Sequence, residues 1–320
     1  MQRRDILKLA VLGAAESVLP KKVFGEAPAP IIDTHIHLFD PTRPEGVPWP
    51  PKDDAALYKQ ALPGRYTTLT AKHHVVGAIA VEASPLLTDN DWLLRVVGNH
   101  PVMVGMIGDL IPGSQNYMAD LERLHRDPLF LGIRYGNLWD RDLSTDLEKP
   151  GFVDGLKALA QAGLVLDSAN PDAKLIRAIR TVGERVPELR IVIDHLPNAK
   201  LPTQKAELDQ YWADLKYLGQ RPNVFVKLSE IPTRRDGRLV TDAGAYRGRL
   251  DRLWFLFGED RVLFGSDWPN SDHVATYDET LSIVQSYTST KDPGAQAKYF
   301  WKNSIAAYKW KPRRQDQHLT

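Results

Sequence analysis

The sequence has no cysteine among its 320 residues, and this absence excludes several kinds of chemistry. Without thiols the chain cannot form disulfides, thiolate zinc sites or a cysteine nucleophile, so histidine and carboxylate side chains are the strong metal ligands that remain. Cysteine usage therefore gives no information about the redox compartment.

A surplus of one charge sign is also absent. The formal net charge is +1, from 41 Lys and Arg against 40 Asp and Glu, and no basic block is interleaved with aromatic residues. The composition favours neither nucleic acid nor a membrane surface as a partner, and it predicts a small-molecule substrate. It leaves open whether the chain forms a homo-oligomer.

Two common catalytic motifs are missing as well. No Gly-x-Ser-x-Gly segment occurs, which disfavours a hydrolase with a serine nucleophile. No glycine-rich phosphate loop follows the first expected strand, which disfavours an open, doubly wound nucleotide-binding fold. The hydrophobic content of 43% still provides material for a sizeable core.

The N-terminus resembles an export signal. Arg3-Arg4-Asp5-Ile6-Leu7-Lys8 precedes an apolar segment at 9–19, which predicts a twin-arginine signal and a periplasmic protein. Glu16 interrupts the apolar segment, and prolines within 25–30 make a poor cleavage site, so the alternative is a disordered or helical N-terminus on a cytoplasmic protein. The segment is too short and too interrupted for a transmembrane helix. We exclude 1–29 from the fold prediction.

Between residues 30 and 310 the chain alternates short apolar strands with helical patterns, and a polar tail at 311–320 follows. The expected strands are 31–37, 75–83, 101–107, 129–135, 164–167, 189–195, 224–229 and 261–267. Helical spacing is present at 89–97, 117–124, 152–161, 170–186, 207–218, 246–257, 277–286 and 294–310. Eight strands in strict alternation with helices predict a single-domain α/β fold, a (β/α)8 TIM barrel.

Polar residues gather where these strands end. His35 and His37 end the first strand, and side chains two apart on a strand share a face, so they predict a divalent metal clamp or a proton-handling pair. Further strand ends carry chemical side chains in chain order: Glu82, Arg134, Asp167, His195 and Asp267. In a parallel barrel these ends surround one cavity, where the chemistry takes place.

These motifs resemble those of the amidohydrolase superfamily, and within it family 2, the branch that includes sugar-acid lactonases and 2-pyrone-4,6-dicarboxylate lactonase. The matching segments span nearly the whole expected domain, and they are Ile32-Asp33-Thr34-His35-Ile36-His37-Leu38-Phe39-Asp40-Pro41, Val81-Glu82-Ala83, Gly132-Ile133-Arg134-Tyr135, Val192-Ile193-Asp194-His195 and Leu263-Phe264-Gly265-Ser266-Asp267-Trp268-Pro269. The resemblance implies a hydrolase on a TIM barrel.

The sequence also departs from the superfamily pattern. Arg134 and Asp167 stand near the places where two-metal members carry a bridging lysine and a histidine, so a binuclear site is not expected. After His195 the chain continues as Leu196-Pro197-Asn198-Ala199-Lys200 where the branch often has Gly-Lys-Pro. The substrate contacts of this loop therefore cannot be transferred from the family.

The resemblance implies hydrolysis of a lactone of a sugar acid or related carboxylate, with Asp267 as the general base. His35, His37, His195 and Asp267 would hold one zinc or manganese ion, or the histidines would polarise the carbonyl without a metal. Arg134 would bind the substrate's carboxylate or polarise its carbonyl. The further residues expected at the substrate are Glu82, Tyr135, Trp268, Trp49 and His273.

Two other functions fit the same motifs. Relatives on this barrel are metal-dependent decarboxylases, which is the alternative enzyme prediction. A barrel that binds sugar acids without turning them over is the third hypothesis.

Overall fold

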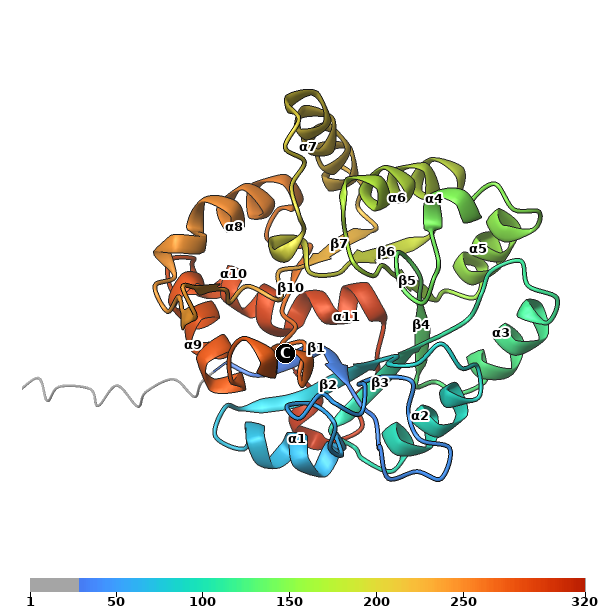
Figure 1. The fold of residues 1–320 in the computed structure, drawn as a ribbon, viewed down its shortest axis with the longest axis horizontal. Helices are drawn as coiled ribbons and strands as arrows, with labels where there is room; N and C mark the ends of the chain where they lie inside the picture. The colour runs from blue at the N-terminus through green and yellow to red at the C-terminus, as the bar shows by residue number, and fades with distance from the viewer. Residues whose placement is uncertain (1–28, 320) are drawn as a thin grey trace, which may run out of the picture.

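The computed structural model describes residues 29–319 (Figure 1). Eight parallel strands form one sheet in the order β1-β2-β3-β4-β5-β6-β7-β10, and helices surround it. The strands are β1 (Ile31–His37), β2 (Val75–Val81), β3 (Met103–Gly108), β4 (Phe130–Arg134), β5 (Val165–Asp167), β6 (Arg190–Ile193), β7 (Val224–Lys227) and β10 (Val262–Leu263). Most are nearly continuous apolar runs, because a parallel sheet under helices is buried on both faces.

The barrel closes between β1 and the segment that follows β10. Thr34 N donates to Phe264 O at 3.1 Å, Asp267 N donates to His35 O at 2.9 Å, and His37 N donates to Trp268 O at 2.7 Å. We call this β1 to 264–268 junction the seam. The predicted TIM barrel is confirmed.

The α-helices fill the connections between strands and pack their apolar sides on the sheet. They are α1 (Pro63–Thr70), α2 (Asp89–Gly98), α3 (Tyr117–His125), α4 (Leu143–Asp146), α5 (Phe152–Gln161), α6 (Ala173–Arg185), α7 (Lys205–Gly219), α8 (Gly244–Phe257), α9 (Tyr277–Thr288), α10 (Pro293–Ala297) and α11 (Asn303–Tyr308). Single-turn 3₁₀ helices lie at Leu196–Asn198, Asn270–His273 and Gln315–Gln317. In residues 29–319 no helix is long and apolar enough to cross a membrane.

Local signals in the sequence explain several helix ends. The Asp172 side chain accepts from Leu175 N and caps α6, while Thr276 and Glu279 form a capping box at the start of α9. Gly163 follows α5 with φ +71°, a conformation that ends helices and suits glycine.

The interior of the barrel is a hydrophobic cluster of its own. Every strand contributes to it, and the C-terminal segment adds Trp301, Tyr308 and Trp310. Figure 1 shows α11 lying across the ring of strands. The C-terminal segment therefore fills one end of the barrel and leaves the strands' C-terminal ends free for chemistry.

The helical pattern predicted over 294–310 corresponds to a continuous helical segment at 293–308, but this segment is not α-helical throughout. Five residues, Lys298–Lys302, form a π-helix between α10 and α11. The Tyr299 carbonyl accepts from Phe264 N at 3.1 Å, so it is drawn away from the helix to the seam. A helix that gives up a carbonyl to a partner outside it commonly widens by one residue.

Residues 311–319, predicted as a polar tail, pack across the opposite end of the barrel from the strands' C-terminal ends. The Arg313 guanidinium donates to the carbonyls of Val97, Gly98 and Met103 at 2.6–2.8 Å. The Gln317 amide donates to Val76 O at 2.9 Å and to Pro101 O at 2.8 Å. Carbonyls at the starts of β2 and β3 therefore find their partners in this segment.

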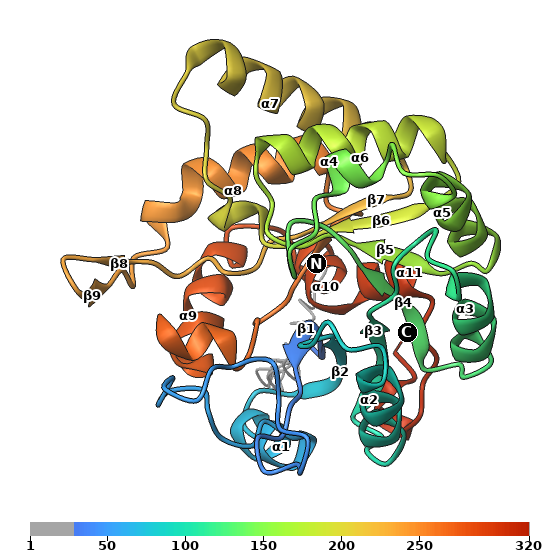
Figure 2. The same ribbon diagram turned by 45° about the vertical axis from the view of Figure 1, so that its right-hand side comes forward.

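Sequence patterns missed two helices and one hairpin. Helices α1 and α4 lack a clear apolar period, and the hairpin of β8 (Arg234–Arg235) and β9 (Arg238–Leu239) is polar. Figure 2 shows that hairpin standing away from the barrel. The twin-arginine segment lies outside the described residues.

Candidate active site

Asp33 fixes the seam beneath the site. Its Oδ1 accepts from Ser266 N at 2.8 Å and from His35 N at 3.2 Å, and its Oδ2 accepts from Tyr66 Oη at 2.9 Å. The side chain is fully buried. One carboxylate therefore holds the histidine-bearing strand against the segment that carries Asp267.

The two histidines of β1 meet Asp267 across this seam. The Nε2 atoms of His35 and His37 are 3.2 Å apart, and Asp267 Oδ1 lies 3.2 Å from His37 Nε2 and 3.5 Å from His35 Nε2. His195 Nε2 lies 3.8 Å from the same oxygen. Three histidine nitrogens thus surround one carboxylate oxygen.

That oxygen is the most informative atom of the site. Asp267 Oδ1 is buried and has no hydrogen-bond partner among the described residues, whereas Oδ2 accepts from Asn270 Nδ2 at 2.7 Å. A buried carboxylate oxygen without a partner is costly, and bound metals or protons commonly account for one.

The residues fit a single divalent ion. Ligand atoms of His35, His195 and Asp267 all lie within 4.8 Å of one another, and the separations at His37 are 3.2 Å. A tetrahedral zinc ion with ligands at about 2.0–2.1 Å places neighbouring ligand atoms about 3.3 Å apart. His35, His37, His195 and Asp267 would hold it, and bound there the ion would act as a Lewis acid on the carbonyl or on water.

Burial shifts the pKa values of several groups in the cluster. It holds the pKa of His35 well below its usual value, with the Lys227 charge adding to the effect. Burial and the Arg134 charge lower the pKa of His37 to about 4. Burial and neighbouring Glu230 raise the pKa of Asp267 well above that of an ordinary aspartate. His35 and His37 are therefore neutral, and Asp267 is a stronger base than a solvated carboxylate.

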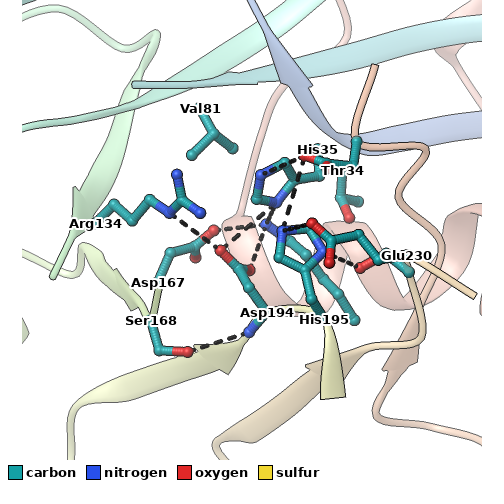
Figure 3. A network of polar contacts seen from close by, with 12 residues as sticks. Thr34, His35, Val81, Arg134, Asp167, Ser168, Asp194, His195 and Glu230 are labelled. Carbon is teal, nitrogen blue, oxygen red and sulfur yellow. Dashed lines mark hydrogen bonds and ion pairs between the residues drawn. The ribbon is translucent and has the colours of Figure 1, made fainter. Parts of the chain in front are cut away.

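Arg134 approaches from the end of β4 and is held between two acids. Its Nε lies 3.4 Å from Asp194 Oδ2, and its Nη1 lies 3.6 Å from Glu82 Oε1. Figure 3 shows the guanidinium directed at Asp194. Glu82 Oε2 accepts from Trp139 Nε1 at 3.0 Å, so this carboxylate also fixes an indole of the wall.

These groups open into a cavity of about 190 Å³ at the C-terminal ends of the strands, which is large enough for a single sugar ring. It is lined by His37, Trp49, Glu82, Ala83, Arg134, Leu138, Trp139, Asn170, His195, Glu230, Asp267 and Asn270. The sequence placed six of these residues at the site, namely His37, Trp49, Glu82, Arg134, His195 and Asp267. His35 lies just below the cavity and is fully buried.

The backbone around the cavity is strained in a consistent way. Five of its non-glycine residues have φ between 49° and 61°, and they are Trp139, Asn170, His195, Glu230 and Asp267. Residues other than glycine and asparagine rarely adopt this left-handed conformation, and it is found preferentially at functional sites. The chain turns sharply after β6, β7 and β10, and these turns bring the side chains of His195, Glu230 and Asp267 into the cavity.

Two residues expected at the substrate lie elsewhere. Tyr135 Oη donates to Asp146 Oδ2 at 2.6 Å and its ring packs on Phe152, because successive side chains alternate and Arg134 takes the inward position. Trp268 is fully buried and its ring lies 5.4 Å from that of Tyr66. Both side chains stabilise the wall behind the cavity.

His273 and Asp167 also differ from expectation. His273 Nε2 lies 2.8 Å from Asp54 Oδ2, at a neighbouring pocket of about 350 Å³ that shares Glu230, Asp267 and Asn270 with the cavity. Asp167 is buried deeper in the barrel, where Oδ2 accepts from Lys227 Nζ at 2.7 Å and from Tyr308 Oη at 3.0 Å. The strand-end position alone did not distinguish the cavity from the layer beneath it.

Sequence patterns missed several residues of the site. Glu230 comes just after β7 and faces His195, with its Oε1 3.8 Å from Nε2. Lys227 is a charged residue in the buried strand Val224-Phe225-Val226-Lys227, which is itself a signal, because lysine is almost never fully buried without a partner. Trp139 and Asn170 lie in loops, and Asn270 begins a single-turn 3₁₀ helix, so no periodicity predicts where these side chains lie.

Comparison with known proteins decides the family. A family model described as "Amidohydrolase" matches residues 32–310. The chain belongs to this family. It is therefore a member of a hydrolase family, as the motifs indicated.

Three similar proteins are informative. An L-fucono-1,5-lactonase of Burkholderia ambifaria is 29% identical over 90% of this chain and 98% of its own length. A zinc-bound amidohydrolase from Burkholderia multivorans has a TM-score of 0.76 at 22% identity, covering 88% of this chain and 100% of that one. A manganese-bound 5-carboxyvanillate decarboxylase from Novosphingobium aromaticivorans has a TM-score of 0.62 at 16% identity, covering 88% and 96%. At these identities the two solved structures establish the shared fold.

Proposed function

We propose that this protein hydrolyses the 1,5-lactone of a sugar acid, with Asp267 as the general base. The observation that carries the proposal is Asp267 Oδ1, a buried carboxylate oxygen that has no hydrogen-bond partner among the described residues and faces three histidines at the floor of the cavity. The 29% identity to an L-fucono-1,5-lactonase over nearly the whole chain supports the same reaction.

The proposed reaction uses the groups in place. Water adds to the lactone carbonyl while Asp267 takes its proton, and Arg134 and His195 stabilise the developing negative charge on the carbonyl oxygen. The bond from the carbonyl carbon to the ring oxygen then breaks, and Asp267 returns the proton to the leaving oxygen. The product is an open-chain hydroxy acid that ionises, so each turnover releases one proton to the solution.

The charge of the cavity favours a neutral lactone over a carboxylated substrate. Its lining includes the acids Glu82, Glu230 and Asp267, against one arginine, Arg134, which two acids already contact. A substrate with free carboxylates would meet repulsion there. The indoles of Trp49 and Trp139 offer apolar surfaces for the C–H faces of a sugar ring. These features weigh against a decarboxylase acting on a carboxylated aromatic.

The test measures proton release by pH-stat titration on a panel of aldono-1,5-lactones, and carbon dioxide is detected in parallel. We expect proton release without carbon dioxide, and a 10²- to 10⁴-fold loss of kcat in Asp267→Asn. Asp272→Asn is the matched control, because Asp272 contacts Arg65 at 3.4 Å outside the cavity and should keep full activity. Release of carbon dioxide would favour the decarboxylase. Ligand binding without turnover, with an affinity that Asp267→Asn leaves unchanged, would favour the non-catalytic binder.

We further propose, from Arg3-Arg4 and the apolar segment after them, that the chain is exported to the periplasm. The small-molecule substrate is consistent with either compartment. A homo-oligomer also stays a proposal.

A further inference from the structure

Lys227 is a fully buried lysine directly below the histidine cluster, and the proposed reaction gives it no role. Three acceptor atoms surround its ammonium: Asp167 Oδ2 at 2.7 Å, Asp194 Oδ1 at 3.0 Å and His35 Nδ1 at 3.1 Å. An ammonium has three N–H donors and no acceptor. Its contacts with Asp167 and His35 are hydrogen bonds, and its contact with Asp194 is an ion pair.

The contact with Lys227 decides which nitrogen of His35 carries the proton. Lys227 Nζ lies 3.1 Å from Nδ1 and can only donate, so Nδ1 carries no proton and the ring is neutral. A neutral ring has one N–H and one lone pair. Since Lys227 can only donate, Nδ1 has to accept, and the proton lies on Nε2.

The partner of His37 fixes the other end of this chain of contacts. His37 Nδ1 lies 3.1 Å from the carbonyl oxygen of Val81, which can only accept, so His37 carries its proton on Nδ1. Its Nε2 is then free to accept from His35 Nε2 at 3.2 Å. Donors point in one direction from Lys227 through His35 and His37 to Val81, and Figure 3 shows His35 within this network.

This arrangement makes the two histidines unequal toward a metal. A ligating nitrogen needs a free lone pair directed at the ion. His37 has that lone pair on Nε2 already, whereas His35 has a proton there. To bind a metal, His35 has to carry its proton on Nδ1, where Asp194 Oδ2 at 3.6 Å could accept it. Lys227 would then lose its third acceptor.

We propose that Lys227 sets the metal affinity of the site by holding His35 in the form whose cavity-facing nitrogen carries a proton. Lys227 is thus a positioning residue that weakens metal binding, while Asp194 favours it, as carboxylates behind ligating histidines do. The inference rests on the ligand set and not on the substrate. A chain without lactonase activity would leave its test unaffected.

The first measurement reads the proton position directly. In the metal-free, full-length protein labelled with ¹⁵N in histidine, long-range ¹H–¹⁵N spectra distinguish a protonated Nε2 from a protonated Nδ1. We expect Nε2–H at His35 in the unmodified chain and Nδ1–H in Lys227→Met, where Asp194 Oδ2 can accept from Nδ1. Nδ1–H at His35 in the unmodified chain would overturn the proposal.

The second measurement is the zinc dissociation constant, obtained by competition with a chromophoric chelator. We expect Lys227→Met to bind zinc at least about 10-fold more tightly. Arg134→Met is the charge control, since it removes a buried cation that contacts Asp194 and Glu82 rather than His35. Equal gains in the two variants would show a simple field effect and refute the role of the hydrogen bond, as would an unchanged affinity in Lys227→Met.

Lys227→Met removes the lysine that pairs with Asp167 and leaves Asp194 with Arg134 alone, so a folding defect has to be anticipated. The double variant Lys227→Met/Asp167→Asn removes one of the two acids and keeps Asp194 behind His35. The same gain in zinc affinity is expected there, and its absence in the folded double variant would reject the proposal.

Discussion

Asp167 shows at the scale of one residue how far burial moves a carboxyl group. Burial raises its pKa from 3.8 to about 7, even though Lys227 opposes the shift. Between these values the folded protein binds more protons than the unfolded chain. The contribution of Asp167 to stability is therefore complete below about pH 4 and is lost as the pH rises towards 7.

Replacing this acid should remove that loss. Asp167→Asn cannot ionise, so its unfolding free energy relative to the unmodified chain should rise by about 2–3 kcal/mol between pH 5 and pH 8. Urea unfolding at the two pH values measures the difference.

Asp194→Asn is the control with the opposite shift. Burial alone would raise the pKa of Asp194, but Lys227 and His35 hold it well below 3.8. Its stabilisation is therefore present above about pH 4 and constant from pH 5 to 8, so the Asp194→Asn curve should run parallel to that of the unmodified chain. An Asp167→Asn curve that also ran parallel would contradict the assignment.

The residue scale also shows the limit of motif reading. Strand ends identified His35, His37, Arg134, His195 and Asp267, because the C-terminal ends of parallel strands meet at one edge. One position further along the chain the prediction was wrong for Tyr135 and Trp268. Whether the residue after a strand turns inward depends on the backbone bend there, which the sequence does not encode in a readable period.

At the scale of elements, the loop at 38–62 provides a wall of the cavity. Trp49 lies on it, with ring centroids 5.1 Å from Phe39 and 5.6 Å from His37. Arg43 anchors the loop to α2, donating to Asp89 Oδ1 at 2.7 Å and lying 4.7 Å above the Trp92 ring. Arg43 does not line the cavity itself, but it holds the loop that carries Trp49.

We expect Arg43→Met to loosen this wall without touching the reaction. KM for the lactone should rise about 3- to 10-fold, with kcat within about twofold. Part of the substrate's binding free energy would then be used to order the loop. Steady-state kinetics separates the two constants.

Arg123→Met is the matched control. Arg123 of α3 pairs with Asp91 of α2, the helix that Arg43 also contacts, but it is exposed and away from the cavity. It should change neither constant. A fall in kcat with unchanged KM in Arg43→Met would show that the loop acts on the chemical step instead.

The alternation of elements was readable from sequence because each strand is a compact apolar run and most helices have an apolar period. The start and end of α5, 152–161, agree with the prediction, and a glycine with positive φ ends it. Helix α1 was missed because Pro63-Gly64 opens a polar, threonine-rich segment. The hairpin of β8 and β9 was missed because nothing buries it.

At the scale of the whole molecule, the two ends of the barrel have different tasks. The C-terminal ends of the strands carry the candidate active site, and the N-terminal ends are covered by α11 and by residues 311–319. The interior cluster packs between the two ends, and Tyr308 of α11 reaches through it to Asp167, whereas residues 311–319 make their hydrogen bonds at the starts of β2 and β3.

Removing residues 311–320 should therefore cost stability and spare activity. The segment supplies hydrogen bonds from Arg313 and Gln317 to carbonyls that water would otherwise have to reach. At about 1 kcal/mol for each net hydrogen bond, we expect a loss of about 5 kcal/mol in unfolding free energy. Denaturant titration measures it, and kcat/KM at 25 °C should stay within about twofold. A large loss of kcat/KM in the folded, truncated protein would show that the two ends are coupled.

The position of the seam has a consequence for how the protein is made. The two histidines of β1 leave the ribosome early, whereas Asp267 and the segment that closes the barrel are among the last parts of the chain to be synthesised. Because Asp267 N donates to His35 O only after closure, a nascent chain has no complete ligand set, however much of the barrel has already formed. The complete set of residues that would hold a metal, together with the proposed base Asp267, is therefore assembled only when the seam has closed.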